Sequence, residues 1–334
     1  MNQQIKHGLQ ARGSGIRRVI ISAAVYAMFA SPLAGASDGA AKPIEAAPIK
    51  SNRVILIDAT KAGKRLVAVG ERGVVLYSDD DGAQWIAQRT PVTRTLTTVA
   101  FSTDKVGVAV GHGGSILRTE DGGGSWNKVD VAEVGKDSLL GLTHLGGSEF
   151  IAYGAFGLFL ASKDDGKPWE RKSVVNQDFD RHIMAVVASG TFWFLAAESG
   201  NIARSKDRGV TWEALKSPYV GSFFGAVVTK DGAILAFGMR GNVWRSTDQG
   251  TTWVKIETNT KIGINGGRVL EDGTVVLVGN TGLILTSTDN GGSFKISMAP
   301  QGMGYATVVP NGKGELVAAG EAGVSVLAGK LWGK

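Results

Sequence analysis

Residues 78–85 read Ser-Asp-Asp-Asp-Gly-Ala-Gln-Trp, and they contain a pattern, Ser/Thr-x-Asp-x-Gly-x-x-Trp, that returns five more times along the 334-residue chain. In the sixth copy phenylalanine replaces the tryptophan. The aromatic residues are 41, 43, 43, 41 and 41 positions apart, and this near-constant spacing indicates an internal repeat of about 42 residues. The aspartate and aromatic positions are Asp80 and Trp85, Asp121 and Trp126, Asp164 and Trp169, Asp207 and Trp212, Asp248 and Trp253, and Asp289 and Phe294.

A glycine turn recurs in phase with this pattern. Each copy is preceded by an apolar strand, a short Gly-x-x-Gly-like turn and a further strand. Seven such turns are present, so we count seven units, although the last one lacks the aspartate pattern. The second glycines of the turns are Gly73, Gly114, Gly157, Gly200, Gly241, Gly282 and Gly323.

The fifth unit shows how each repeat is expected to fold. Four short segments, 223–228, 234–237, 243–246 and 253–256, are apolar or β-branched and are separated by turn residues. Such spacing predicts an antiparallel meander of four strands. A period in the forties with four strands per unit is typical of propeller blades. The sequence therefore predicts an all-β, seven-bladed β-propeller.

The aspartate pattern has a structural explanation. The carboxylate can accept backbone N–H groups of its own turn, and the glycine can adopt a left-handed conformation. The aromatic residue is then expected to anchor the outer strand against the neighbouring sheet. Three arginines at one position of three third strands, Arg118, Arg204 and Arg245, are expected to lie along the blade surface and pair with acids.

The ring must also be closed. One repeat after the sixth copy, the pattern is replaced by Ala328, Lys330 and Trp332, so the seventh unit lacks its own fourth strand. One period before Trp85 lies Ile44. We therefore expect a segment at about residues 40–49 to pair with residues 324–327 and close the ring.

The first 36 residues have the features of a secretory signal. A basic start is followed by an apolar stretch of twelve residues, 19–30, and by the small residues Ala34, Gly35 and Ala36. Twelve residues are too few to span a bilayer, which needs about 20. We expect residues 37–334 to be the propeller and its location to be the periplasm. Without the signal, 32 basic and 30 acidic residues remain, which argues against nucleic acid as a partner.

The sequence contains no recognisable catalytic or metal-binding motif. There is no cysteine, no P-loop, no Gly-x-Ser-x-Gly and no His-Glu-x-x-His, and the four histidines are scattered. We therefore expect no catalytic residues, no metal and no cofactor.

The best candidates for binding lie in the turns between second and third strands and in the links between blades. These segments should share one face of the ring, opposite the aspartate turns, and they vary most between repeats. Arginine combined with aromatic residues is typical of interfaces, although the same residues can be ordinary solvated loop positions. The candidates are Arg72, Arg89, Arg94, His112, Phe156, Arg181, His182, Tyr219 and Arg240.

Units such as residues 110–123, Val-Gly-His-Gly-Gly-Ser-Ile-Leu-Arg-Thr-Glu-Asp-Gly-Gly, resemble the bacterial neuraminidase repeat, or Asp-box. Over about residues 40–334 the seven short units resemble the photosystem II stability/assembly factor family. That resemblance implies an exported, non-enzymatic propeller that assists assembly through an arginine-containing face. In phototrophs such proteins act in the thylakoid lumen, and some bacterial relatives are associated with transporters of the resistance-nodulation-division type.

The resulting hypothesis is a monomeric, non-catalytic scaffold that binds a membrane or periplasmic protein and aids its assembly or stability. A thylakoid location follows only if the source is a phototroph. The alternative is a carbohydrate-binding protein or a sialidase-like glycoside hydrolase, so a glycan remains a possible ligand. Against the hydrolase, the Arg-Ile-Pro segment of sialidases is absent and no pair of carboxylates suited to glycoside cleavage can be identified.

Overall fold

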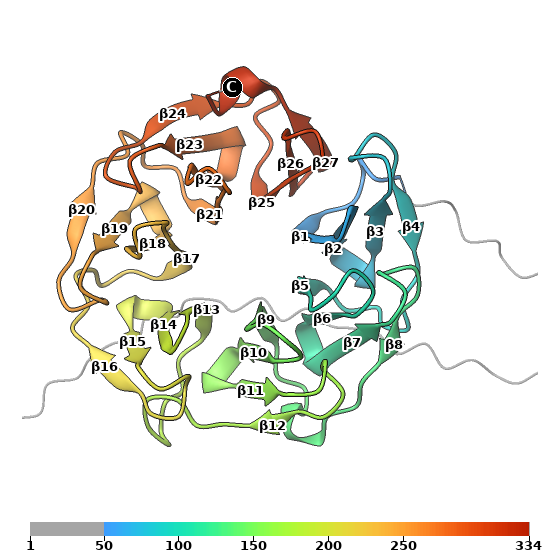
Figure 1. Cartoon of the computed structure of the whole chain (residues 1–334), viewed down its shortest axis with the longest axis horizontal. Helices are drawn as coiled ribbons and strands as arrows, with labels where there is room; N and C mark the ends of the chain where they lie inside the picture. The colour runs from blue at the N-terminus through green and yellow to red at the C-terminus, as the bar shows by residue number, and fades with distance from the viewer. Residues whose placement is uncertain (1–49, 334) are drawn as a thin grey trace, which may run out of the picture. The chain divides into compact units, whose positions relative to one another are not determined.

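Seven antiparallel sheets follow one another along the chain and are arranged in a ring around a central channel (Figure 1). The computed structural model describes residues 50–333. The all-β, seven-bladed propeller predicted from the repeat is confirmed. The predicted signal at 1–36 and the predicted closing strand at 40–49 lie outside the described residues. Within residues 50–333, no helix is long and apolar enough to cross a membrane.

Each complete blade is a meander of four strands with the first strand innermost. The strands are β1 (Leu56–Ala62), β2 (Arg65–Gly70), β3 (Val75–Ser78) and β4 (Ile86–Gln88) in blade 1; β5 (Leu96–Phe101), β6 (Gly107–Gly111), β7 (Ser115–Thr119) and β8 (Asn127–Lys128) in blade 2; β9 (Leu139–His144), β10 (Phe150–Gly154), β11 (Phe159–Ser162) and β12 (Glu170–Arg171) in blade 3; β13 (Ile183–Ser189), β14 (Phe192–Ala197), β15 (Ile202–Ser205) and β16 (Glu213–Leu215) in blade 4; β17 (Phe223–Val228), β18 (Ile234–Gly238), β19 (Val243–Ser246) and β20 (Val254–Ile256) in blade 5; β21 (Ile264–Val269), β22 (Val275–Gly279), β23 (Leu283–Ser287) and β24 (Lys295–Met298) in blade 6; and β25 (Tyr305–Pro310), β26 (Leu316–Gly320) and β27 (Gly323–Leu327) in blade 7. The four strands expected in the fifth unit match β17 to β20 closely.

The second strand of each blade forms the centre of the core. Every residue of β10, β18, β22 and β26 is buried, which explains why these strands are continuous apolar runs rather than alternating ones. The buried clusters draw residues from adjacent blades, so the core lies between the sheets. A blade alone would leave both faces of its second strand in water.

The aspartate pattern forms a closed hydrogen-bonded turn. In the first copy, the N–H of Gly82 donates to Ser78 Oγ at 2.9 Å, and the N–H of Gln84 donates to Asp80 Oδ1 at 2.8 Å. The indole of Trp85 donates to the carbonyl of Gly82 at 3.0 Å. Serine, aspartate and tryptophan therefore satisfy backbone groups that a bare turn would leave to water.

The aromatic residue of each turn packs on the preceding blade. Trp126 of blade 2 lies in one cluster with Val67 and Val69 of blade 1. The ring centroids of Trp253 in blade 5 and Phe194 in blade 4 are 5.5 Å apart. Each repeat thus carries the residue that joins it to the repeat before it.

Arginines connect the same turns to their neighbours. Arg245 donates from Nε to the carbonyl of Asn290 in the next blade at 2.9 Å and pairs with Asp231 at 2.6 Å. Asn290 adopts a left-handed φ of 55°, which directs its carbonyl out of the turn. The expectation that Arg118, Arg204 and Arg245 pair with acids is confirmed, since Arg118 pairs with Glu120 and Arg204 with Glu213.

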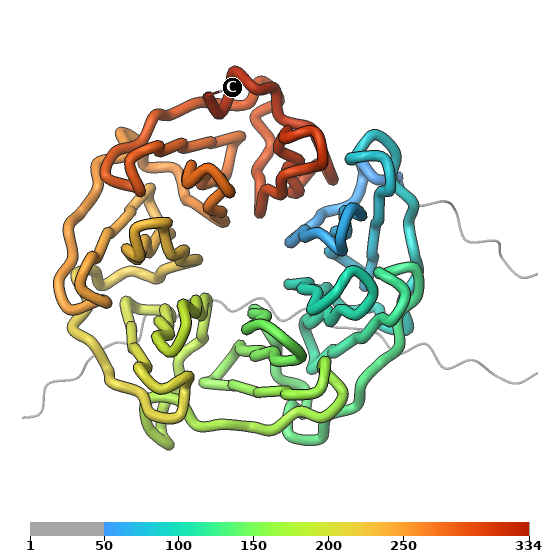
Figure 2. The backbone as a smooth tube through the Cα atoms, viewed as in Figure 1, coloured from blue at the N-terminus to red at the C-terminus, as the bar shows by residue number. Residues whose placement is uncertain are grey.

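The last blade lies beside the first, where β1 packs against β25 and β26 (Figure 2). Three strands of blade 7 lie within the described residues. The backbone near Ser51 packs tightly against Gly323, since a Cβ added to this glycine would lie 1.7 Å from the carbonyl oxygen of Ser51. Gly73 of blade 1 has the same kind of contact, because a Cβ added there would lie 2.1 Å from the carbonyl oxygen of Val92. Because Val92 follows the fourth strand of blade 1, Ser51 occupies the place that follows a fourth strand in blade 7.

This geometry sharpens the closing-strand prediction. Removing residues 40–49 from the mature protein should leave an unpaired edge on β27 and lower the melting temperature by roughly 5–10 °C, since several ladder hydrogen bonds of about 1 kcal/mol each are lost. The thermal melt is followed by circular dichroism. The control is the mature protein without residues 37–39, which should melt as the mature protein does. An unchanged melt after removal of 40–49 would exclude this strand.

The turn aspartates predict a loss of stability in acid. Hydrogen bonds from Thr211, Thr252 and Ser287 are the main causes that lower the pKa values of Asp207, Asp248 and Asp289, respectively, to about 2, below the ordinary 3.8. A lowered folded-state pKa gives stability that is present above pH 4 and is lost as the pH falls toward 2.

The measurement is the melting temperature between pH 2 and 7. The triple variant with Asn at positions 207, 248 and 289 should melt lower at pH 7 and change less between pH 4 and 2 than the unmodified protein. Asp178→Asn, an exposed position outside the turns, is the control. If the melting temperatures of the triple variant and of the unmodified protein changed equally with pH, the prediction would be contradicted.

Candidate partner-binding face

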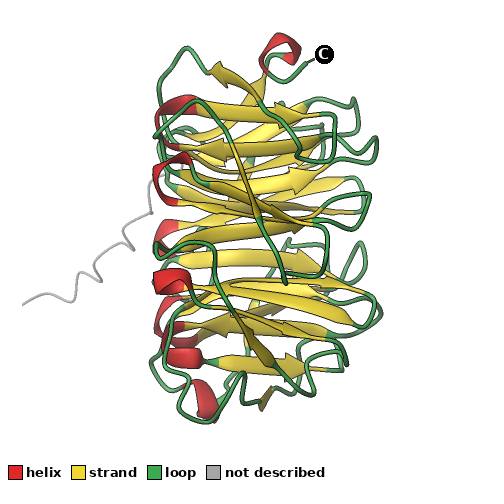
Figure 3. Ribbon diagram, turned by 90° about the vertical axis from the view of Figure 1, so that its left-hand side faces the viewer, coloured by secondary structure: helices red, strands yellow, loops and turns green. Residues whose placement is uncertain are grey.

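The turns between second and third strands lie together on one side of the ring. In blades 1 to 6 each is a short 3-10 turn, and Figure 3 shows these turns along one edge of the molecule. They are η1 (Glu71–Gly73), η2 (His112–Gly114), η4 (Ala155–Gly157), η5 (Glu198–Gly200), η6 (Met239–Gly241) and η7 (Asn280–Gly282). The segments that connect successive blades reach the same side. The last glycine of each turn lies against a backbone carbonyl oxygen of such a connecting segment.

The middle residue of these turns is held in a left-handed conformation. Five of these residues are not glycine, and their φ values lie between 52° and 56°. Such a conformation costs an L-residue about 1–2 kcal/mol. The glycine that follows has no room for a side chain, so the turn cannot relax there. The five exposed side chains at these tips are Arg72, Phe156, Ser199, Arg240 and Thr281.

A basic pocket lies beside the turn of blade 1. Its cavity of about 580 Å³ is lined by four cationic side chains, with Val54, Val74 and Val92 among the apolar residues of the wall. Glu71 is the one carboxylate of the lining, and its Oε1 accepts the N–H of Ile55 at 3.1 Å. The pocket therefore has a strong positive excess. Its cations are Lys50, Arg53, Arg72 and Arg89.

A second group forms around Phe156, a residue that is 59% exposed. The N–H of Phe156 donates to Nδ1 of His182 at 3.3 Å, and the two rings meet edge-on with centroids 4.9 Å apart. Glu198 Oε1 accepts the N–H of His182 at 3.0 Å. The side chain of Arg181 pairs with Asp180 at 3.4 Å. This group places an exposed aromatic ring beside a fixed imidazole.

The other predicted residues lie apart from these two groups. The stem of Arg94 lies next to Gly113, and the ring of His112 lies 3.4 Å from the hydroxyl of Ser138. Tyr219 packs against Phe223, with ring centroids 5.7 Å apart, and supports the link between blades 4 and 5. Arg240 borders a separate hollow next to Lys255 and Glu257.

The structure thus brings Arg72 and Arg89 together, and Phe156, Arg181 and His182 together. Sequence reasoning missed Lys50 and Arg53, which complete the basic pocket. Arg53 stands 41 residues before Arg94, one repeat interval, so the period itself could have identified it.

Comparison with solved structures supports the fold. A structure described as YCF48 bound to D1 peptide has a TM-score of 0.69 and 17% identity, over 82% of this chain and 91% of the other. YCF48 from Cyanidioschyzon merolae has a TM-score of 0.66 and 17% identity, over 82% and 95%. The WD40 β-propeller domain of Doa1 has a TM-score of 0.67 and 13% identity, over 86% and 97%.

Comparison with curated proteins finds no match. Residues 83–333 match the family model described as photosynthesis system II assembly factor YCF48. This match covers six of the seven blades and most of the chain, and it agrees with the resemblance carried by the glycine and aspartate turns. The chain therefore belongs to the YCF48 photosynthesis system II assembly factor family.

Proposed function

We propose that this protein is an exported, non-catalytic scaffold whose 3-10-turn face binds a membrane or periplasmic protein and aids its assembly or stability. The observation that carries this proposal is the basic pocket of Lys50, Arg53, Arg72 and Arg89, which fits an acidic segment of a partner. The exposed ring of Phe156 on the same face supplies an apolar anchor of the kind enriched at interfaces.

Two further observations support a protein partner. A structural relative, YCF48, has been solved bound to a D1 peptide. In addition, the strained left-handed tips place Arg72, Phe156 and Arg240 in the solvent on one face. These three side chains are therefore accessible to a partner.

The proposal of a non-catalytic role rests on how the Asp-box carboxylates are used. In Asp121, Oδ1 accepts the N–H of Ser125 and Oδ2 accepts its hydroxyl, at 2.9 and 2.7 Å. A carboxylate bound in this way serves its own turn and has little capacity left for a sugar.

A panel of aryl glycosides tests the hydrolase alternative and a glycan array tests the lectin alternative. Turnover or selective glycan capture would replace the scaffold proposal.

We further propose that the protein reaches the periplasm through the signal at residues 1–36, and in a non-phototroph the partner can belong to a transporter system. Fractionation of cells with N-terminal sequencing tests export. The mature protein should be periplasmic and begin near residue 37, and a cytoplasmic protein that retains residue 1 would contradict export.

The partner is sought by crosslinking cells that contain the tagged protein and purifying it. Reversing three charges of the pocket, with Glu at positions 53, 72 and 89, should reduce capture of the specific partner at least about tenfold, because favourable pairs become repulsive ones. The reduction should be smaller at high salt, where exposed charges are screened.

The matched control reverses three exposed lysines near the opposite, Asp-turn face, Lys105, Lys163 and Lys206, which changes the net charge by the same amount. This variant should capture the partner as the unmodified protein does. Equal losses in both variants would indicate a general charge effect, and undiminished capture by the pocket variant would exclude this pocket as the binding site.

A further inference from the structure

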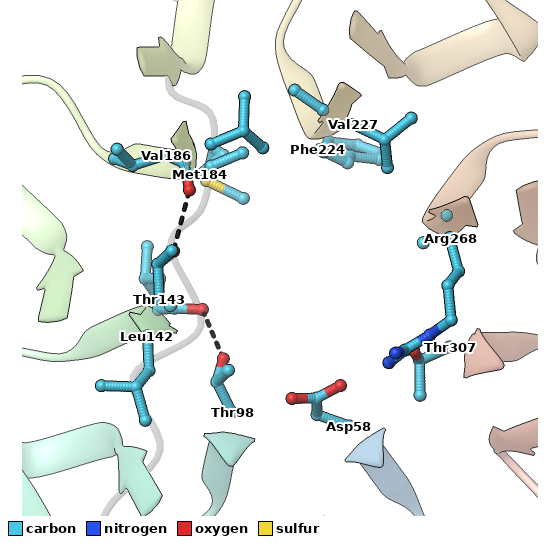
Figure 4. Close-up of a pocket in the computed structure, with 18 of the residues that line it drawn as sticks. Asp58, Thr98, Leu142, Thr143, Met184, Val186, Phe224, Val227, Arg268 and Thr307 are labelled. Carbon is cyan, nitrogen blue, oxygen red and sulfur yellow. Dashed lines mark hydrogen bonds between the residues drawn. The ribbon is translucent and has the colours of Figure 1, made fainter. Parts of the chain in front are cut away.

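The central channel contains a second concave region that the proposed function does not use. Its cavity of about 790 Å³ is lined mainly by the first strands of all seven blades (Figure 4). Large concave cavities with an apolar wall and a few convergent polar groups are where proteins bind small molecules. The channel therefore has the general form of a small-molecule site.

The wall of the channel is divided into an apolar part and a polar part. Blades 3 to 5 contribute Leu142, Met184, Val186, Phe224 and Val227, which lie on the side of the cavity shown at the left and top of Figure 4. The hydroxyls next to this side are already engaged in hydrogen bonds between blades. Thr143 donates to the carbonyl of Val186 at 2.8 Å, and Thr98 donates to that of Leu140 at 3.4 Å.

Asp58 of blade 1 is the carboxylate of the polar part. Its Oδ2 accepts the N–H of Val99 in blade 2 at 3.0 Å, and Thr307 of blade 7 also bonds to it. Burial raises the pKa of Asp58 to about 6, against the opposing effects of these hydrogen bonds and of Arg268. An ionisable group with a raised pKa inside a cavity is a typical feature of functional sites.

Arg268 of blade 6 is the cation of the polar part. Its Nε donates to the carbonyl of Val308 at 2.7 Å and its Nη2 to that of Ala59 at 3.3 Å. Within residues 50–333, Nη1 has no hydrogen-bond partner, and Asp58 and Arg268 form no direct ion pair. Figure 4 shows the carboxylate and the guanidinium facing the same open part of the channel.

We propose that the central channel binds a small zwitterion, an apolar α-amino acid, with its carboxylate on Arg268, its ammonium on Asp58 and its side chain against the wall of Met184 and Phe224. A ligand with a single negative charge at Arg268 would be repelled by Asp58, and one with a single positive charge at Asp58 would be repelled by Arg268. A molecule with both charges on one carbon satisfies both groups and leaves the channel neutral.

The hydrogen-bonding capacity of the two residues agrees with this ligand. A guanidinium binds a carboxylate through parallel N–H groups, and Nη1 of Arg268 supplies donors that residues 50–333 leave unused. A carboxylate offers about four acceptor positions, so the three hydrogen bonds that Asp58 receives from Val99, Ala59 and Thr307 leave room for a further donor. The cavity is large enough for leucine, methionine or phenylalanine together with water.

The test is calorimetric titration and thermal shift of the mature protein at pH 7.5, where Asp58 is largely ionised. Leucine, methionine and phenylalanine should bind and raise the melting temperature. N-acetylleucine, which lacks the ammonium, and leucinamide, which lacks the carboxylate, should bind at least about tenfold more weakly, as expected for loss of a charged hydrogen bond.

Substitutions of the channel residues test whether the amino acid binds at this site. Asp58→Asn and Arg268→Gln should lose leucine binding, whereas Lys163→Gln, an exposed position near the Asp-turn face, should retain it. If either channel variant fails to fold, Phe224→Ala replaces it and should weaken phenylalanine binding more than alanine binding.

The proposal is overturned by any of three results. These are no binding of the three amino acids at millimolar concentration, equal binding of the two blocked derivatives, or unchanged binding by the folded channel variants. A lower melting temperature of the channel variants, with no amino-acid binding by the unmodified protein, would assign Asp58 and Arg268 to ring closure alone.

Discussion

The contact between each Asp-turn aromatic and the preceding blade is the interaction on which the rest of the structure depends. Trp126 shows its two parts, since the ring packs on Val67 and Val69 and the indole N–H donates to the carbonyl of Gly123 at 3.2 Å. The second strand of a blade is buried on both faces, and this is possible only when neighbours cover it. Stability therefore belongs to the ring, and each blade needs the next.

This arrangement gives the two faces of the ring different roles. On the Asp-turn side, the hydroxyl of the serine or threonine donates to the aspartate in five of the six copies, so most of these polar groups already bond within their own turns. In the third copy, Pro168 has no N–H to donate to Asp164. On the other side, the turn requires only a left-handed middle residue and a following glycine. The middle position can then be arginine, phenylalanine, serine or threonine, which leaves that face free to differ from blade to blade.

The sequence predicted the ring well because its determinants are periodic. Asp80 and Trp85 recur at nearly constant intervals, and Gly73 has its counterpart in every blade. The two sites were harder to predict because they depend on departures from the repeat. Asp58 is aligned by strand register with Thr98 and Thr307. The other four blades have glycine or alanine at this position, so only a comparison of the copies reveals the carboxylate. Arg268 likewise follows two glycines inside a strand that gives no sign of facing a channel.

The junction of the last and first blades joins both sites to the closure of the ring. At the inner radius, Arg268 reaches across blade 7 to bind the carbonyl of Ala59 in β1. On the 3-10-turn face, the carbonyl of Ser51 lies against Gly323, and the neighbouring Arg53 lines the basic pocket. Residues 50–54, which lie beside blade 7 and lead into β1, thus form part of the pocket. A partner that binds it selects the closed ring, and by mass action its binding free energy adds to the stability of this junction.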